Sequence, residues 1–276
     1  MKALASALGV ALLAVGATAC TGEEPPKTAP KSTPPSFTEV QAPTQPAQVA
    51  QIAERAMQAA QSVQVRVSST SQAGNPDEST ARIRFSGGSP MAHVTLVEGS
   101  GTSQGILLNG TMYLRSGDEP VVPGKPWLKL TRQDLANPKL GPFGRLFKLV
   151  FDEMEAAVKD ATGDTGLAVV GAGTLDRPPV TENLGGVPVT RYDGKTDTEK
   201  LRAVDREFAS LADQGVKSVP WRMWIDQYGL PRRFVIDLET PAAKVSSSAV
   251  YSEWGKDQSI TPPPGGQVAT INDIGS

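Results

Sequence analysis

Cys20 is the residue whose position most clearly implies a chemical reaction. It is the only cysteine among 276 residues, and Ala17-Thr18-Ala19 places small residues directly before it. This arrangement is typical of a lipobox, in which diacylglycerol is attached to the cysteine sulfur and the leader is cleaved. Lys2 and the apolar stretch 3–15 supply the charged and hydrophobic parts of a signal peptide, and this stretch is too short to span a bilayer.

We therefore predict a signal peptide over residues 1–19 and an acylated Cys20 that anchors the chain to membrane lipid. The alternative is an ordinary secretory signal cleaved after Ala19, in which Cys20 is incidental. Because Cys20 stands alone, no intramolecular disulfide can form, and the folded part must be held together by its core.

No other residues have the spacing of a catalytic or metal site. His93 is the only histidine, no G-x-S-x-G motif is present, and no cluster has metal-ligand spacing. The chain has 27 basic and 29 acidic side chains, so it lacks the basic excess that marks nucleic-acid binding. We expect a protein that is not an enzyme and has no cofactor, metal or nucleic-acid partner.

A stripe of aromatic residues allows two interpretations. Phe143, Phe147 and Phe151 recur every four residues in a predicted helix over about 143–159, with Met154 on the same apolar face. The stripe is either core packing or one wall of an acyl-chain pocket, because ligand pockets are mainly apolar and resemble a core in sequence.

If the stripe lines a pocket, two predicted hairpins supply the opposite wall. Leu107, Met112 and Leu114 share one face of the first hairpin, and Met223 and Ile225 share one face of the second.

Three arginines flank the second hairpin: Arg222, Arg232 and Arg233. They are either solvated strand residues or donors to a lipid phosphate.

A predicted alternation of helices and short strands positions these candidate site residues. The Asn109-Gly110 pair predicts a type I′ hairpin turn, and Thr196-Asp197-Thr198-Glu199 predicts a helix-capping box. Helices are predicted over about 46–62, 143–159 and 196–215, and strands over 63–71, 81–86, 91–97, 104–115, 127–130, 167–175, 187–192, 221–238 and 244–254.

The short connections between consecutive strands predict an antiparallel sheet with helices covering one face, which is an α+β fold with a single curved sheet. We place this domain at 46–264. Residues 20–45 are rich in Pro and Thr and are expected to form a tether, and 265–276 a flexible tail.

Several segments together resemble a known family. They are ERAMQAAQSVQVRV in the first helix and strand, NGTMYLR and PWLKL in the middle, GGVPVTRYDGKTD before the third helix, and WRMWIDQYGLPRRFVID and AVYSEWGK near the end. They resemble the actinobacterial LppX/LprG-like lipoproteins, in the wider LolA/LolB-like class of lipid carriers, and extend over nearly all of 46–264.

The resemblance implies a half-barrel, that is, a curved antiparallel sheet wrapped round long helices, with an apolar cavity for acyl chains. It also implies a lipoprotein on the extracytoplasmic face of the cell membrane that binds a lipid or glycolipid for transport or presentation. The alternative is an interaction, assembly or sensor lipoprotein with a closed core and an envelope protein as partner. An internal apolar cavity distinguishes the two.

Overall fold

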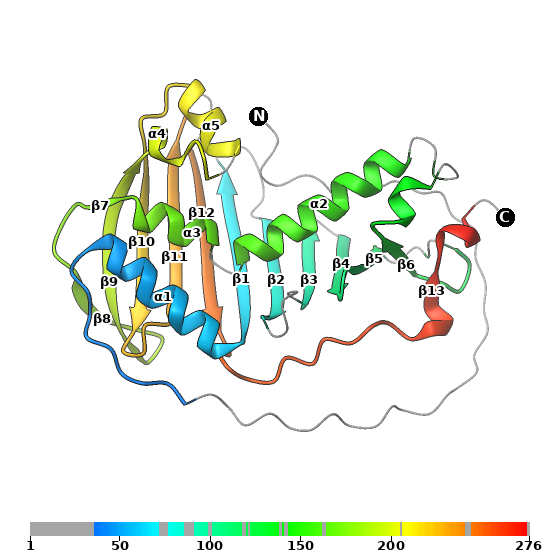
Figure 1. Cartoon of the computed structure of the whole chain (residues 1–276), viewed down its shortest axis with the longest axis horizontal. Coiled ribbons are helices and arrows are strands. Elements are labelled where there is room, and N and C mark those ends of the chain that lie inside the picture. The colour runs from blue at the N-terminus through cyan, green and yellow to red at the C-terminus, as the bar shows by residue number, and fades with distance from the viewer. Residues whose placement is uncertain are drawn as a thin grey trace.

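A single large sheet dominates the structure, which is a computed structural model. It describes residues 36–71, 77–85, 91–98, 101–117, 120, 122–137, 140, 143–161, 164–204, 206–240 and 244–274. Within these residues thirteen strands form one sheet, with twelve in the order β13-β6-β5-β4-β3-β2-β1-β12-β11-β10-β9-β7 and β8 also paired with β9 (Figure 1).

The strands are β1 (Ser62–Ser71), β2 (Asp77–Arg84), β3 (Met91–Glu98), β4 (Gly101–Leu108), β5 (Thr111–Ser116), β6 (Trp127–Thr131), β7 (Thr174–Leu175), β8 (Val180–Leu184), β9 (Val187–Asp197), β10 (Ser218–Asp226), β11 (Pro231–Glu239), β12 (Lys244–Ser252) and β13 (Val268–Ala269). The helices are α1 (Pro46–Ala60), α2 (Phe143–Ala161), α3 (Asp164–Gly171), α4 (Thr198–Leu201) and α5 (Arg206–Asp213). Short 3-10 turns are η1 (Asp134–Ala136), η3 (Gly265–Gln267) and η4 (Ile271–Asp273).

The sheet is curved and open, as the sequence predicted, with one exception to its antiparallel pairing. β13 pairs with β6 in parallel and forms one edge, whereas all other neighbours are antiparallel. β7 and β8 both pair with β9 and form the other edge. The pairing order therefore runs from edge to edge without closing into a barrel.

Both predicted hairpins are confirmed. Asn109 and Gly110 have φ angles of 50° and 73°, the left-handed values that a type I′ turn requires, and Leu107 faces Met112 across the pair. In the second hairpin the Asp226 carboxylate accepts the N–H groups of Tyr228 (2.9 Å) and Leu230 (3.0 Å) and pairs with a guanidinium, which fixes the turn between β10 and β11.

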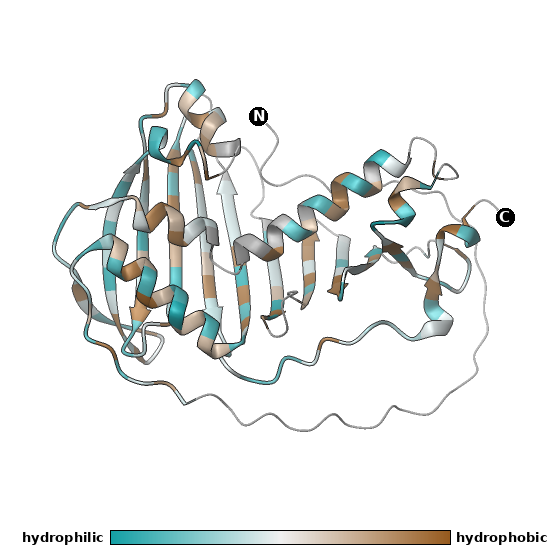
Figure 2. Cartoon of the chain, in the orientation of Figure 1, coloured by the Kyte–Doolittle hydropathy of each residue, from teal (hydrophilic) through white to brown (hydrophobic). Residues whose placement is uncertain are grey.

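Helices α1, α2 and α3 share one face of the sheet and enclose the main core with it. α2 packs against β2 and β4, whereas α3 packs against α1, β9 and β10 (Figure 1). Hydrophobic and hydrophilic residues alternate along α1 and α2 in Figure 2, as expected of helices that bury one side. The structure thus shows α1, α2 and α3 lying on one face of the curved sheet.

Two predicted elements are wrong in detail. Residues 167–175 were predicted as a strand, but 164–171 form α3, because a short apolar run fits a buried helix and a buried strand equally. The long helix predicted after Thr196 is two short helices, α4 and α5. Asp197 caps α4, because the Thr196 hydroxyl instead donates to Val169 O (2.6 Å) and accepts from Trp221 Nε1 (3.0 Å). The sequence also gave no prediction of β8.

Residues 265–274 are not the predicted flexible tail. They form η3, β13 and η4, with Ala269 and Ile271 buried and Asp273 paired with Lys125 at 2.8 Å. This C-terminal strap (residues 253–274) also covers the sheet face opposite the helices, where Ile260 packs with Ile106 and Trp127. Both faces of the first hairpin are therefore covered.

The folded part also begins before Pro46. The Phe37 ring lies 6.0 Å from the Tyr228 ring, and the Val40 N–H donates to Gln227 O at 2.8 Å. Residues 36–45 thus dock beside the β10–β11 turn, although the sequence assigned them to the tether. The predicted signal peptide, Cys20 and residues 21–35 lie outside the described residues.

Candidate functional site

The predicted pocket residues on the first hairpin lie in a closed part of the core. Leu107 and Met112 are 4 % and 0 % exposed, and both belong to a cross-strand row that continues through Ala92 and Leu130. Leu114 is half-buried on the same face. Leu107, Met112, Ala92 and Leu130 in this row are therefore part of the buried core.

The predicted stripe on α2 packs directly on the sheet. Met154 lies so close to Gly105 of β4 that a Cβ added there would come within 2.7 Å of the Met154 sulfur. Phe151 is fully buried, with the Arg132 guanidinium 4.9 Å from its ring centre. Phe147 is half-buried, and the side chain of Phe143 lies outside the described part. The C-terminal half of the stripe is therefore core packing.

Met223 and Ile225 are buried at a different place in the sheet. They lie on β10, six strands from β4, which corresponds to roughly 29 Å along the sheet at about 4.8 Å per strand. α3 covers β10, whereas α2 covers β4. The structure does not bring the two hairpins together under the α2 stripe.

Between these closed regions the helix-bearing face carries half-buried apolar side chains. Val67 on β1 faces Ala249 on β12, and Ala81 on β2 faces Val94 on β3. We call this set the half-buried band; it consists of Val67, Ala81, Val94, Leu96, Ile236, Leu238 and Ala249 on five consecutive strands.

Small polar residues surround the half-buried band. Ser69, Ser79, Ser103 and Ser247 project from the same face and are also half-buried. In contrast, Val65 and Ile83, which lie two residues from Val67 and Ala81 on the same strands, are completely buried. Burial thus decreases from the start of β1 and from the end of β2 towards their opposite ends, which leaves the half-buried band as a partly open apolar surface.

The three arginines of the second hairpin are occupied by protein groups. Arg222 pairs with Asp237 (2.7 Å) and Arg232 with the buried Asp226 (2.6 Å). Arg233 donates to the Ser248 hydroxyl, and its guanidinium lies 5.3 Å from the Trp224 ring. These contacts favour the interpretation of the arginines as strand residues on the face opposite the helices.

A further ion-pair cluster lies beside Trp224 on that face. Arg177 and Arg191 both donate to Asp193 (2.8 and 2.9 Å). Burial raises the pKa of Asp193, but these two hydrogen bonds outweigh it and the net pKa is lowered. Arg191 also donates to Glu182, which accepts the Trp224 indole N–H. The cluster is internally satisfied and stabilises the packing of β8 on β9.

Four buried side-chain polar atoms have no hydrogen-bond partner among the described residues: His93 Nε2, the Tyr192 hydroxyl, Thr198 Oγ1 and Gln214 Oε1. The Tyr192 hydroxyl is in the core under the helices, and burial raises its pKa to about 12. His93 Nε2 is on the opposite face, where burial and then the Arg82 charge lower the pKa of the imidazole.

No group of three or more His, Cys, Asp or Glu in the described ranges could hold a metal ion. The helices that the structure describes include none that is long and apolar enough to cross a membrane.

Sequence reasoning missed the half-buried band for a specific reason. Alternation identifies which strand residues face the helices, but it does not say how far along each strand the helices extend. The available signal was the change from large to small residues on one face, from Val63 and Val65 to Ser69 on β1.

Comparison with known proteins gives limited similarity. No protein-family model matches the chain. It is 24% identical over 186 residues to an uncharacterized 31.2 kDa protein in the rplA-rplJ intergenic region of Streptomyces griseus. That match covers 63% of this chain and 58% of the relative, so the chain spans less than two thirds of the relative's length.

Two solved structures align with most of this chain at low similarity. LprF from Mycobacterium bovis has a TM-score of 0.49 and 16% identity, over 80% of this chain and 97% of LprF. The LolA superfamily protein NE2245 from Nitrosomonas europaea has a TM-score of 0.31 and 12% identity, over 80% of this chain and 99% of that protein.

Proposed function

We propose that this protein is a lipoprotein anchored outside the cytoplasm through Cys20, and that it carries the acyl part of a lipid or glycolipid on the half-buried band. In this proposal the open sheet acts as a half-barrel, and the acyl chain of the cargo fills the space between the sheet and the helices. The half-buried band is the observation on which the proposal depends.

The position and chemistry of the band support an acyl-chain ligand. It extends across five neighbouring strands, from Leu238 on β11 to Leu96 on β3, and so spans about 19 Å at the usual strand spacing. An acyl chain lying across it would bury methylene groups at about 0.8 kcal/mol each. The surrounding serine hydroxyls suit an ester or sugar better than a second apolar surface.

A closed-core interaction protein is the second candidate, and a specific observation favours it. The originally predicted pocket residues Met112, Phe151 and Ile225 are 0–1 % exposed, and Met154 packs against Gly105. If the half-buried band only contributes to the hydrophobic core, the chain would act through its surface. The two candidates make opposite predictions for lipid contact at the band.

Photo-crosslinking of the delipidated full chain tests the proposal. The probe is a phosphatidylglycerol with a diazirine in its acyl chain, and crosslinked peptides are identified by mass spectrometry. We expect crosslinks within β1, β3 and β11, which carry Val67, Leu96 and Leu238. We further expect Val67→Gln to reduce crosslinking severalfold, because an amide on the band must be desolvated by the chain.

Val250→Gln is the matched control. Val250 is on the opposite face of β12 and is 42 % exposed, so its replacement adds the same polar group without touching the band. Equal crosslinking of the two variants, or crosslinks confined to the face opposite the helices, would contradict the proposal. A urea midpoint for Val67→Gln close to wild type shows that lost crosslinking is not lost folding.

A further inference from the structure

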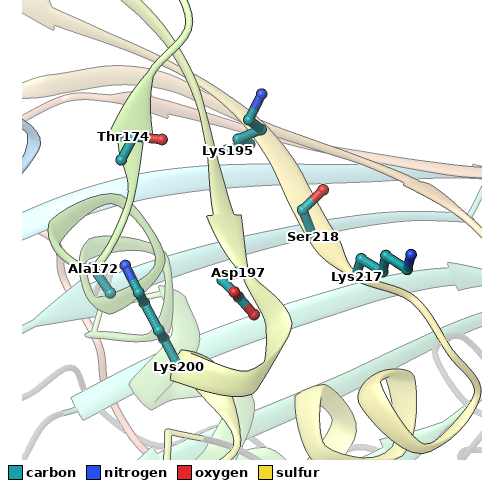
Figure 3. A pocket seen from close by; sticks show the side chains of 7 residues that line it. All are labelled: Ala172, Thr174, Lys195, Asp197, Lys200, Lys217 and Ser218. Carbon is teal, nitrogen blue, oxygen red and sulfur yellow. The ribbon is translucent and has the colours of Figure 1, made fainter.

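A polar pocket lies at the corner of the sheet where β9 ends and β10 begins. Its volume is about 310 Å³ (Figure 3). The strand register places Thr174 beside Lys195 and Asp197 beside Ser218, on the sheet face opposite Trp221 and the main core. The lining residues are Ala172, Thr174, Lys195, Asp197, Lys200, Lys217 and Ser218.

Positive charge exceeds negative charge around this pocket. Three ammonium groups come from three segments, with Lys195 on β9, Lys200 on α4 and Lys217 just before β10 (Figure 3). The lining contains one carboxylate, Asp197, and its Oδ1 already accepts the Glu199 N–H that caps α4. Lysines from separate segments around one hollow raise the local positive potential, which favours binding of an anion there.

Two of the three ammonium groups are available to a ligand. Lys195 pairs with Asp176 at 3.0 Å, outside the pocket lining. Within the part of the chain that the structure describes, neither Lys200 nor Lys217 has a carboxylate at ion-pair distance. The hydroxyls of Thr174 and Ser218 add neutral donors at the same hollow.

We infer that this pocket binds the phosphate group of a compact anionic ligand. Lysine binds phosphate as a point charge, and hydroxyl donors can complete the contacts of the phosphate oxygens. The volume is at the lower end of small-molecule sites, so the pocket fits a headgroup or a sugar phosphate and not a pair of acyl chains. It is on the face opposite the half-buried band and does not depend on the proposed acyl cargo.

Calorimetric titration of the full chain with inorganic phosphate at low ionic strength tests the inference. We expect saturable binding at one site, weakened about tenfold by Lys200→Gln or Lys217→Gln, because a hydrogen bond to a charged group contributes on that order. The double variant should show no saturable binding. Lys244 is an exposed lysine on β12 that pairs with Glu239 on β11, so Lys244→Gln should bind phosphate as wild type does.

Two further ligands distinguish the source of the phosphate. Glycerophosphoglycerol is a soluble phosphodiester, and vesicles of phosphatidylglycerol and phosphatidylcholine present the same headgroup at a membrane. The full chain carries Cys20→Ser in the vesicle experiment, so that acylation does not drive binding. Vesicle binding that falls in the double variant identifies a lipid headgroup, whereas binding of glycerophosphoglycerol alone identifies a soluble ester.

Either source supports the phosphate site. Absence of saturable phosphate binding by the wild type, or binding that is unchanged in the double variant, would overturn it. Urea midpoints of the lysine variants close to that of wild type show that the fold is retained, since all three side chains are exposed.

Discussion

Individual buried hydroxyls in this core have opposite roles. Thr196 donates to Val169 O and accepts from Trp221, and so links β9, α3 and β10, whereas the Tyr192 hydroxyl has no partner among the described residues. A buried hydroxyl without a hydrogen-bond partner loses its hydration without a compensating interaction. A hydroxyl that makes two hydrogen bonds also satisfies the polar groups of its two partners.

We therefore expect Tyr192→Phe and Thr196→Val to have different effects on the free energy of unfolding. Tyr192→Phe should leave the free energy of unfolding unchanged or raise it by up to about 1 kcal/mol. Thr196→Val should lower it by about 1–3 kcal/mol, because the Trp221 indole N–H loses its acceptor. Urea denaturation of both variants checks this. Equal destabilisation would show that a buried water or ligand bonds to the tyrosine.

His93 makes the stability of the protein depend on pH. Burial and the Arg82 charge lower its pKa from the ordinary value of 6.5, so the folded state binds a proton less readily than the unfolded chain. Its contribution is present above pH 6.5 and is lost as the pH falls through the lowered pKa.

The urea midpoint of the wild type should accordingly fall more steeply below pH 6.5 than that of His93→Gln, which cannot titrate. Carboxylates titrate in both proteins and cancel in the comparison. Parallel pH profiles of the two proteins would mean that the His93 pKa is the same in the folded and unfolded states.

Among the elements, the C-terminal strap is the one whose role the sequence least revealed. The Pro/Gly composition of residues 265–276 predicts a tail, but Val268 and Ala269 add β13 to the edge of β6, and Ile260, earlier in the strap, lies over one face of the first hairpin. Apolar residues as sparse as Val268 and Ile271 show no periodicity, so only their tertiary contacts reveal the element.

Removing residues 265–276 should destabilise the fold. The deletion exposes the β6 edge and loses the burial of Ala269 and Ile271, for a cost of at least about 2 kcal/mol. A chain lacking only residues 275–276 is the control and should match wild type. A urea midpoint for the longer deletion that equals the control would show that residues 265–274 contribute nothing to folding.

Local signals predicted the hairpins and the sheet more accurately than the helices. Asn109-Gly110 has a defined turn chemistry, and strand alternation around Trp221 and Met223 correctly assigns both faces. The extent of α3, α4 and α5 depends on tertiary contacts such as Thr196 with Val169, which no local pattern contains. The wide separation of the predicted pocket residues was missed for the same reason, because the strand order that places β4 far from β10 is a property of the whole sheet.

For the molecule as a whole, the open sheet separates two kinds of surface. The helix-bearing face combines a closed core with the half-buried band, and the opposite face carries ion pairs and the lysine-lined pocket. In our account, an acyl chain and an anionic group are thus bound on different sides of one sheet. Binding of an acyl chain is the central claim, because without it the half-buried band is only an incompletely covered part of the core.

Native mass spectrometry of the wild-type chain, released from its own membrane in mild detergent, tests that claim most directly. We predict a mass that includes the acyl groups on Cys20 and, in addition, one lipid that dissociates on collisional activation. A spectrum that contains only the covalently acylated chain, with no dissociable lipid in repeated preparations, would contradict the account and favour the closed-core interaction protein.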